Sequence, residues 1–186
     1  MTQADSSLKG QLLLDGGNLA GSFFHRSVLL ICHHDDQGAF GLMLNRSLGS
    51  NHGLKSALKL PKPLQNRPIF IGGPVQPGAM SFLWTDAFIE HNEVFPGVGM
   101  GHDLDELSER LQHYSPQRDF RIFSGYAGWS PGQLEDELQR EAWLIHTPSQ
   151  KLLFEQDPAK LWKHIMCQRG WEERLMAEAP EDLEAN

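Results

Sequence analysis

Residues 27–45 read SVLLICHHDDQGAFGLMLN, and this stretch decides the fold. It begins with a continuous apolar run to Cys32, which is typical of a β-strand buried on both faces. A polar turn follows and ends at Gly38, and a second apolar run extends from Phe40 to Asn45. Two apolar runs on either side of a polar turn that ends in glycine predict a β-hairpin.

The sequence beyond this hairpin predicts a second one, in which residues 69–71 pair with residues 81–85. The connection between them, residues 72–78, reads GGPVQPG and is too rich in glycine and proline for the interior of a helix or strand. Further short strands are predicted at residues 120–122, 143–145 and 152–154.

Capping signals predict helices at three places in the second half of the chain. Asp103 with Glu106 forms a capping box at the start of the first helix. Ser130, followed by proline, is a strong N-cap for the second. Asp157 caps the third, which ends at Gly170.

Strand patterns dominate the first half of the chain and mixed patterns the second, without a repeat or a change of composition that marks a linker. We therefore expect a single α+β domain over residues 1–171. Residues 172–186 are rich in acids and predict a frayed acidic tail.

Length and composition exclude several classes of protein. The chain has 186 residues, of which 40% are hydrophobic and 22% charged, which excludes an intrinsically disordered protein. No apolar run reaches about 18 residues and the N-terminus is polar, so we expect no membrane span, no secretory signal and a cytoplasmic location. The two cysteines, Cys32 and Cys167, predict neither a disulfide framework nor a thiolate zinc site.

Charge is unevenly distributed along the chain. The net charge is −8, yet no acid occurs between Asp36 and Asp86. This acid-free stretch carries five basic residues between Arg46 and Arg67, so it could meet phosphates or an acidic partner. The basic residues are sparse and lack interleaved aromatics, which favours a solvated loop and disfavours nucleic-acid binding.

Residues 128–132, GWSPG, match the G-x-S-x-G nucleophile elbow of hydrolases. In that motif, the residue after the serine donates its backbone N–H to the oxyanion hole, whereas Pro131 has no N–H to donate. Ser130 also serves better as a helix N-cap. A hydrolase that uses Ser130 is therefore only an alternative, and no catalytic residue is predicted.

The run His33, His34, Asp35, Asp36 carries residue types that bind divalent metals. Adjacent residues of a strand point to opposite faces, so these side chains do not converge on one ion. We therefore predict neither a metal site nor a cofactor.

Three groups of residues are candidates for binding. Asn45 and Arg46 combine an amide with a bidentate donor, although Asn45 could simply satisfy the backbone of a turn. Gly72 and Gly73 could cradle an anion through backbone N–H groups, although a tight connection is favoured. The third group combines aromatic rings with an amide, as binding pockets do, although such aromatics more often belong to the core. It consists of Tyr126, Trp129 and Gln133.

The motifs taken together resemble the YqgE/AlgH family of bacterial proteins. The resemblance rests on S-V-x-x-x-C-x-H from Ser27, N-R at residues 45–46, G-G-P-V from Gly72 and G-Y-A-G-W from Gly125, and it covers roughly residues 10–171. It implies an α+β fold built around a bent, partly barrel-like, mostly antiparallel β-sheet with flanking helices. Some members have been described as candidate transcriptional regulators, and the family has no established activity or assigned catalytic residues.

Our leading hypothesis is a non-enzymatic cytosolic domain that binds a small molecule or a protein partner, with a regulatory role. The alternatives are a transcriptional regulator that binds nucleic acid directly and a hydrolase that uses Ser130. The overall negative charge and the lack of a basic recognition helix disfavour the first alternative.

Overall fold

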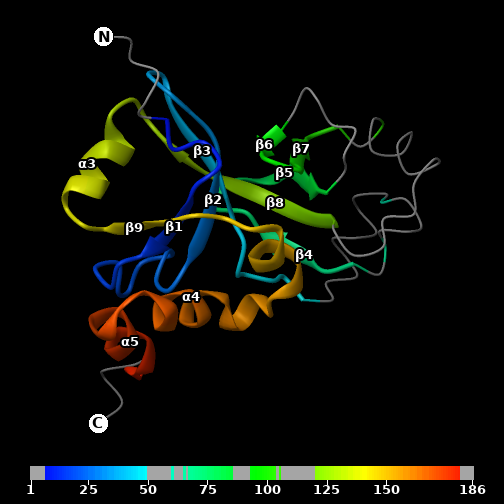
Figure 1. Ribbon diagram of the computed structural model, residues 1–186. Helices are drawn as coiled ribbons and strands as arrows, with labels where there is room; N and C mark the ends of the chain where they lie inside the picture. Colours follow the sequence, from blue (N-terminus) through cyan, green and yellow to red (C-terminus); the bar gives the residue numbers. More distant parts are fainter. Residues whose placement is uncertain are drawn as a thin grey trace.

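The hairpin predicted from residues 27–45 forms the middle of the sheet (Figure 1). β2 (Val28–Asp35) pairs antiparallel with β3 (Gly38–Met43). The computed structural model describes residues 7–49, 60, 65, 67–85, 93–103, 105 and 120–180. The basic residues of the acid-free stretch beyond Arg46 lie outside this part, except Arg67.

Within the described residues, nine strands form one sheet in the order β6-β7-β5-β8-β3-β2-β1-β9, with β4 paired to β8 off this path. The sheet does not close on itself, and every pairing except that of β4 with β8 is antiparallel. The expected α+β class with a mostly antiparallel sheet is confirmed. The remaining strands are β1 (Leu12–Asp15), β4 (Ile69–Ile71), β5 (Val75–Trp84), β6 (Glu93–Phe95), β7 (Val98–Gly101), β8 (Phe120–Trp129) and β9 (Trp143–His146).

Strand β8 joins the two halves of the sheet. Its first half pairs with β5 along one edge and in parallel with β4 along the other, and its last residues pair with β3. The predicted hairpin of residues 69–71 with residues 81–85 is therefore wrong, because each strand pairs with β8 instead. β5 also begins at Val75, inside the predicted connection, and the register shift before Met80 lets the strand accommodate Pro77 and Gly78.

The β-sheet is buried on both faces, as the continuous apolar runs predict. In β2, Val28, Leu30 and Cys32 belong to one core cluster, whereas Leu29 and Ile31 belong to another. Neighbouring residues of a strand point to opposite faces, so an unbroken apolar run supplies both clusters.

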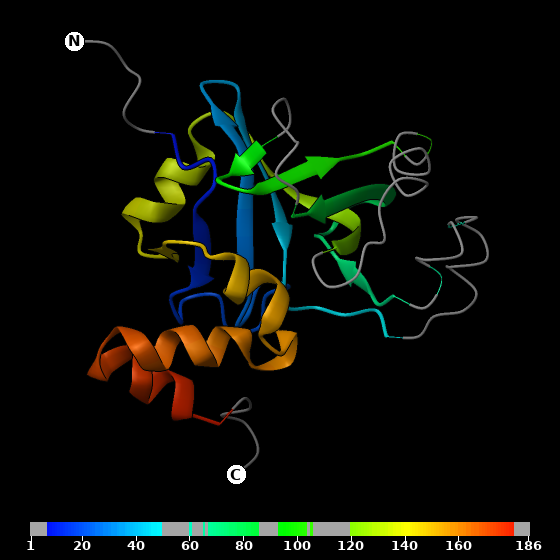
Figure 2. The same cartoon turned by 45° about the vertical axis from the view of Figure 1, so that its right-hand side comes forward.

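Helices cover the two faces separately. α3 (Gln133–Gln139) contributes Leu134 to the cluster of Leu29 and Ile31. α4 (Leu161–Arg169) contributes Ile165 to the cluster of Leu30, and α5 (Trp171–Glu178) lies beside α4 in both views (Figure 1, Figure 2). Two short turns precede α4: the π-helical η2 (Lys151–Glu155) and the 3₁₀-helical η3 (Pro158–Lys160).

The helix predictions succeed in part. Asp157 accepts a hydrogen bond from the Ala159 N–H, as an N-cap does, at the start of η3. The predicted strand at 152–154 is wrong, because those residues lie in η2. Residues 171–178 of the chain form α5 instead of a frayed tail. The helix predicted from Asp103 falls largely outside the described residues.

The helix predicted at Ser130 begins at Gln133, after Gly132 with φ of 76°. Only one half of a capping box is present, in which the Ser130 N–H donates to Gln133 Oε1 over 3.0 Å. Among the described residues, none of these helices is long and apolar enough to cross a membrane.

Candidate functional site

Asn45 and Arg46 follow β3 and hydrogen-bond to the backbone of residues 25–28, which precede and begin β2. Asn45 Oδ1 accepts from the Val28 N–H over 2.9 Å, and its Nδ2 donates to the Arg26 carbonyl over 2.8 Å. Arg46 Nη2 donates to the carbonyl of His25 over 2.5 Å. These hydrogen bonds use both ends of the Asn45 amide, so its contacts in this structure are those of a turn-stabilising residue.

Gly72 and Gly73 lie where the connection from β4 to β5 crosses β8. A Cβ atom on Gly73 would lie 2.1 Å from the carbonyl carbon of Tyr126, and one on Gly72 would lie 2.1 Å from the carbonyl oxygen of Gly125. The two backbones approach so closely that only glycine fits, which is a structural reason for both residues.

The three-residue cluster of Tyr126, Trp129 and Gln133 does not form one site. Tyr126 lies on the same face of the sheet as Phe40 of β3, and the centroids of the two rings are 4.9 Å apart. Trp129 belongs to the core of the opposite face.

Trp129 and Gln133 meet at Glu137, which sequence reasoning missed. One carboxylate oxygen, Oε2, accepts from the indole N–H of Trp129 over 2.8 Å and from that of Trp143 over 2.7 Å. The other, Oε1, accepts from the Gln133 amide over 2.9 Å. Both indole rings are buried, so Glu137 serves to satisfy buried donors beneath α3.

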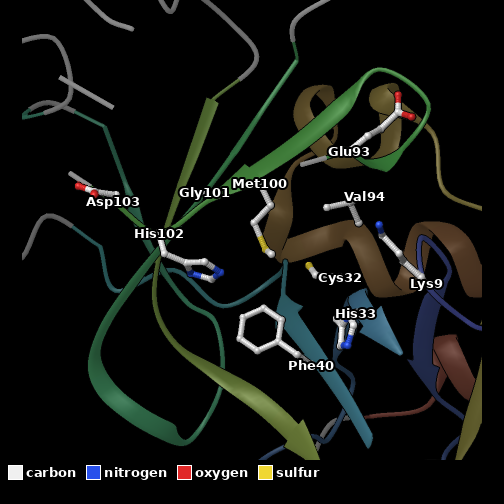
Figure 3. Close-up of a pocket in the computed structure, with 10 residues that line it drawn as sticks. All are labelled: Lys9, Cys32, His33, Phe40, Glu93, Val94, Met100, Gly101, His102 and Asp103. Carbon is white, nitrogen blue, oxygen red and sulfur yellow. The ribbon is translucent and has the colours of Figure 1, made fainter. Parts of the chain in front are cut away.

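A pocket of about 600 Å³ opens between the β2–β3 hairpin, β7 and the segment before β1 (Figure 3). We call it the β7 pocket. None of the seven predicted binding residues lines it. Its lining comprises Lys9, Cys32, His33, Phe40, Glu93, Val94, Met100, Gly101, His102 and Asp103.

The centre of the β7 pocket combines aromatic and sulfur-containing side chains. Figure 3 shows the Phe40 ring, the His102 imidazole and the sulfur atoms of Met100 and Cys32 pointing toward one another. The His102 ring stands edge-on to Phe40, with centroids 5.7 Å apart and planes at 81°. His102 Nδ1 hydrogen-bonds to the buried hydroxyl of Ser81 over 3.1 Å, which leaves Nε2 for a ligand.

The rim of the pocket carries charged groups of both signs. Figure 3 shows the Lys9 ammonium group on one side, whereas the carboxylates of Glu93 and Asp103 point outward. A flat apolar surface beside an ammonium group and an imidazole suits a ligand with an apolar ring and an anionic group.

A neighbouring pocket of about 490 Å³ shares Lys9 and Val94 with the β7 pocket. It continues past the start of β1 toward residues 147–150. Lys9 therefore lies between the two pockets, and its ammonium group can contact an anionic group in either of them.

Cys32 lines the β7 pocket but is not an activated nucleophile. The residue is 3% exposed, and burial raises the pKa of its thiol well above its usual range, although the charge of Lys9 acts in the opposite direction. Since the thiolate is the reactive form, the thiol stays protonated and inert near neutral pH.

We expect Cys32 to be alkylated by iodoacetamide at about pH 8 more than about 100-fold more slowly than after unfolding, because only unfolding restores an ordinary thiol pKa. Peptide mass spectrometry over time measures the rate, with the half-buried Cys167 as the reference in the same sample. Equal rates for Cys32 in folded and unfolded protein would contradict this assignment.

Among the described residues, the side chains of the other motifs do not come together in a catalytic or metal-binding arrangement. Ser130 is exposed, and no histidine hydrogen-bonds to it within residues 120–180. His33 pairs with Asp35 over 2.9 Å, whereas His34 Nε2 lies 2.7 Å from Glu135 Oε1. No three His, Cys, Asp or Glu side chains of the described residues lie together in a group that could hold a metal.

His34 has a second contact that sequence reasoning did not find. Its Nδ1 accepts the Leu8 N–H over 2.9 Å, so Nε2 carries the proton that is shared with Glu135. This contact holds the segment that carries Lys9 against the hairpin.

The sequence carries little signal for the β7 pocket. Phe40 lies on β3, whereas Met100 and His102 lie on and just after β7, far from Phe40 in the chain. None of them stands in a spaced motif, so only the pairing of β5 with β7 and β8 brings them together.

Comparison with known proteins places the chain in a family. A family model described as AlgH-like matches residues 12–174. UPF0301 proteins of Chlorobium phaeobacteroides and Cytophaga hutchinsonii are 35% and 33% identical to the chain, and the alignments cover 92% of both chains in the first case and 96% and 98% in the second.

Solved structures support the same assignment. The solution structure of the AlgH protein from Pseudomonas aeruginosa has a TM-score of 0.73 with 27% identity, covering 97% of this chain and 98% of that one. A crystal structure of a Corynebacterium diphtheriae protein, 18% identical with a TM-score of 0.72 over 96% and 95% of the two chains, shares the fold. The confirmed resemblance therefore leads to one conclusion: the chain belongs to the AlgH-like family.

Proposed function

We propose that this protein is a non-enzymatic binding protein of the cytosol with a regulatory role, and that its ligand is a small molecule with a flat apolar part and an anionic group. The observation that carries the proposal is the β7 pocket, in which Phe40 and His102 form two walls and Lys9 supplies a positive charge. Its volume of about 600 Å³ lies in the range of small-molecule sites.

Three features support binding rather than catalysis. The Cys32 thiol has a raised pKa, which disfavours covalent chemistry. Ser130 lacks a hydrogen-bonded histidine within the described residues. The His102 imidazole is oriented by Ser81, a neutral hydroxyl, rather than by a carboxylate that would strengthen it as a base.

A ligand of this kind is expected to lose at least about tenfold in affinity when Phe40 is replaced by alanine, because the variant removes the apolar wall that a ring would contact. A thermal-shift screen of nucleotides and of aromatic carboxylates and phosphates identifies the ligand, and calorimetry then measures its dissociation constant. His102→Ala should weaken the same ligand, and Lys9→Gln should reduce the salt dependence of binding.

Matched controls separate a site effect from a general loss of stability. Phe23 is 46% exposed and does not line the β7 pocket, so Phe23→Ala should leave the affinity unchanged. The proposal fails if every hit binds Phe40→Ala and wild type equally. Conversion of a bound compound, followed by NMR over hours, would contradict the non-enzymatic assignment.

A further inference from the structure

Arg121 is a buried cation that has no counter-ion among the residues that the structure describes. It lies on β8 and is 7% exposed. Burial lowers the pKa of its guanidinium group to about 10. Within the described part of the chain, the ion pairs involve other residues, and none brings a carboxylate within 4.0 Å of Arg121. Burial of a charged group without a partner lowers the stability of the folded state, so the presence of an arginine at this position needs an explanation.

The contacts of Arg121 use little of its hydrogen-bonding capacity. Nη1 donates to the Leu44 carbonyl over 3.1 Å. The guanidinium carbon lies 4.8 Å from the ring centroid of Phe70 and 6.0 Å from that of Phe154. A guanidinium group has five N–H donors, and these contacts use one of them as a hydrogen bond.

The unused donors of Arg121 still reach the surface. The fully buried side-chain nitrogen and oxygen atoms without partners include those of His25 and Ser27 but none of Arg121, among the residues described. The small exposed part of Arg121 therefore includes guanidinium nitrogen, and an anion can approach it there.

The described surroundings of Arg121 explain why none of their side chains neutralises it. Leu44 and Phe70, which contact the guanidinium group, both belong to the stretch between Asp36 and Asp86 that contains no acid. Phe154 of η2 covers the other side with a ring. Aromatic rings can orient a guanidinium group, but they carry no negative charge that would neutralise it.

We infer that Arg121 anchors a second binding site, separate from the β7 pocket, for a small oxyanion that presents a phosphate or carboxylate group. The planar guanidinium group can donate two parallel hydrogen bonds to either group. Phe70 and Phe154 hold the plane in place, so an arriving oxyanion meets donors that are already oriented.

The test compares the response of three proteins to inorganic phosphate and to malonate at constant ionic strength. Wild type and Arg174→Met should show a saturable rise in Tm of about 5–10 °C at 100 times the dissociation constant. Arg174 is a matched control because it is an exposed arginine with a carboxylate partner, Glu178. Arg121→Met should lose the saturable rise and, without added anion, should melt no lower than wild type.

Each result decides the inference. A rise with phosphate alone assigns a phosphoryl ligand, and a rise with both anions assigns a general oxyanion site. An equal rise in Arg121→Met would show that the anions act through the solvent and would overturn the inference. So would the absence of a rise in wild type. If Arg121→Met does not fold, Arg121→Lys should bind phosphate at least about tenfold more weakly, because it lacks the planar fork, and unchanged affinity would also overturn it.

Discussion

Replacement of Gly73 by alanine is expected to lower the free energy of unfolding by more than about 3 kcal/mol, because the added methyl group overlaps with backbone that cannot move independently. The new Cβ would lie 2.1 Å from the carbonyl carbon of Tyr126, 2.2 Å from its oxygen and 2.3 Å from the nitrogen of Ala127. Relief of these overlaps would require β5 and β8 to separate, with loss of their ladder.

Gly78 provides the matched control for this substitution. It lies five residues further along the chain, in β5, and a Cβ atom there would meet nothing within 4 Å. Gly78→Ala should therefore change the unfolding free energy by less than about 1 kcal/mol. Urea unfolding followed by circular dichroism measures both. Equal stability of the two variants would contradict the close approach of the strands.

The second large effect is expected at Glu137, whose replacement by alanine should cost about 2–3 kcal/mol, since buried donors without acceptors are costly. The variant leaves the indole N–H groups of Trp129 and Trp143 without their acceptor. Both rings are largely buried, at 7% and 4% exposure, so water replaces the carboxylate poorly. A change in tryptophan fluorescence should accompany the loss.

Asp136→Ala is the control for Glu137→Ala, because Asp136 is the exposed acid next to it on α3. We expect it to cost less than about 1 kcal/mol, mainly through the helix dipole. Glu137→Gln should lie between the two, since one amide oxygen can still accept. If Glu137→Ala unfolds at the same urea concentration as Asp136→Ala, the carboxylate is not the acceptor that stabilises this core.

The sequence predicts the local parts of this fold well. The β2–β3 hairpin needs only an apolar run, a turn and a second apolar run, and its pairing partner is the next strand in the chain. The short strand β9 and the helix that follows Asp157 likewise depend on nearby residues. The continuous apolar run of β2 also predicts its burial on both faces correctly.

Non-local pairing explains the failures. Nothing in residues 69–71 shows that β4 pairs with β8 in parallel, because the choice between partners depends on the whole sheet. Residues 152–154 form an apolar run too short to distinguish a strand from a helical turn. The β7 pocket is likewise assembled by strand pairing, so motif spacing could not reveal it.

The position of β8 determines the order in which the chain can assemble on the ribosome. β3, β4 and β5 are all synthesised before β8, the strand with which each of them pairs in the sheet. Until residue 129 has emerged, the β8-facing edges of β3, β4 and β5 lack this partner strand, and unpaired edges invite association between nascent chains. We therefore expect the chain to be prone to aggregation before β8 has been synthesised, and the pairing of β8 covers these three edges together.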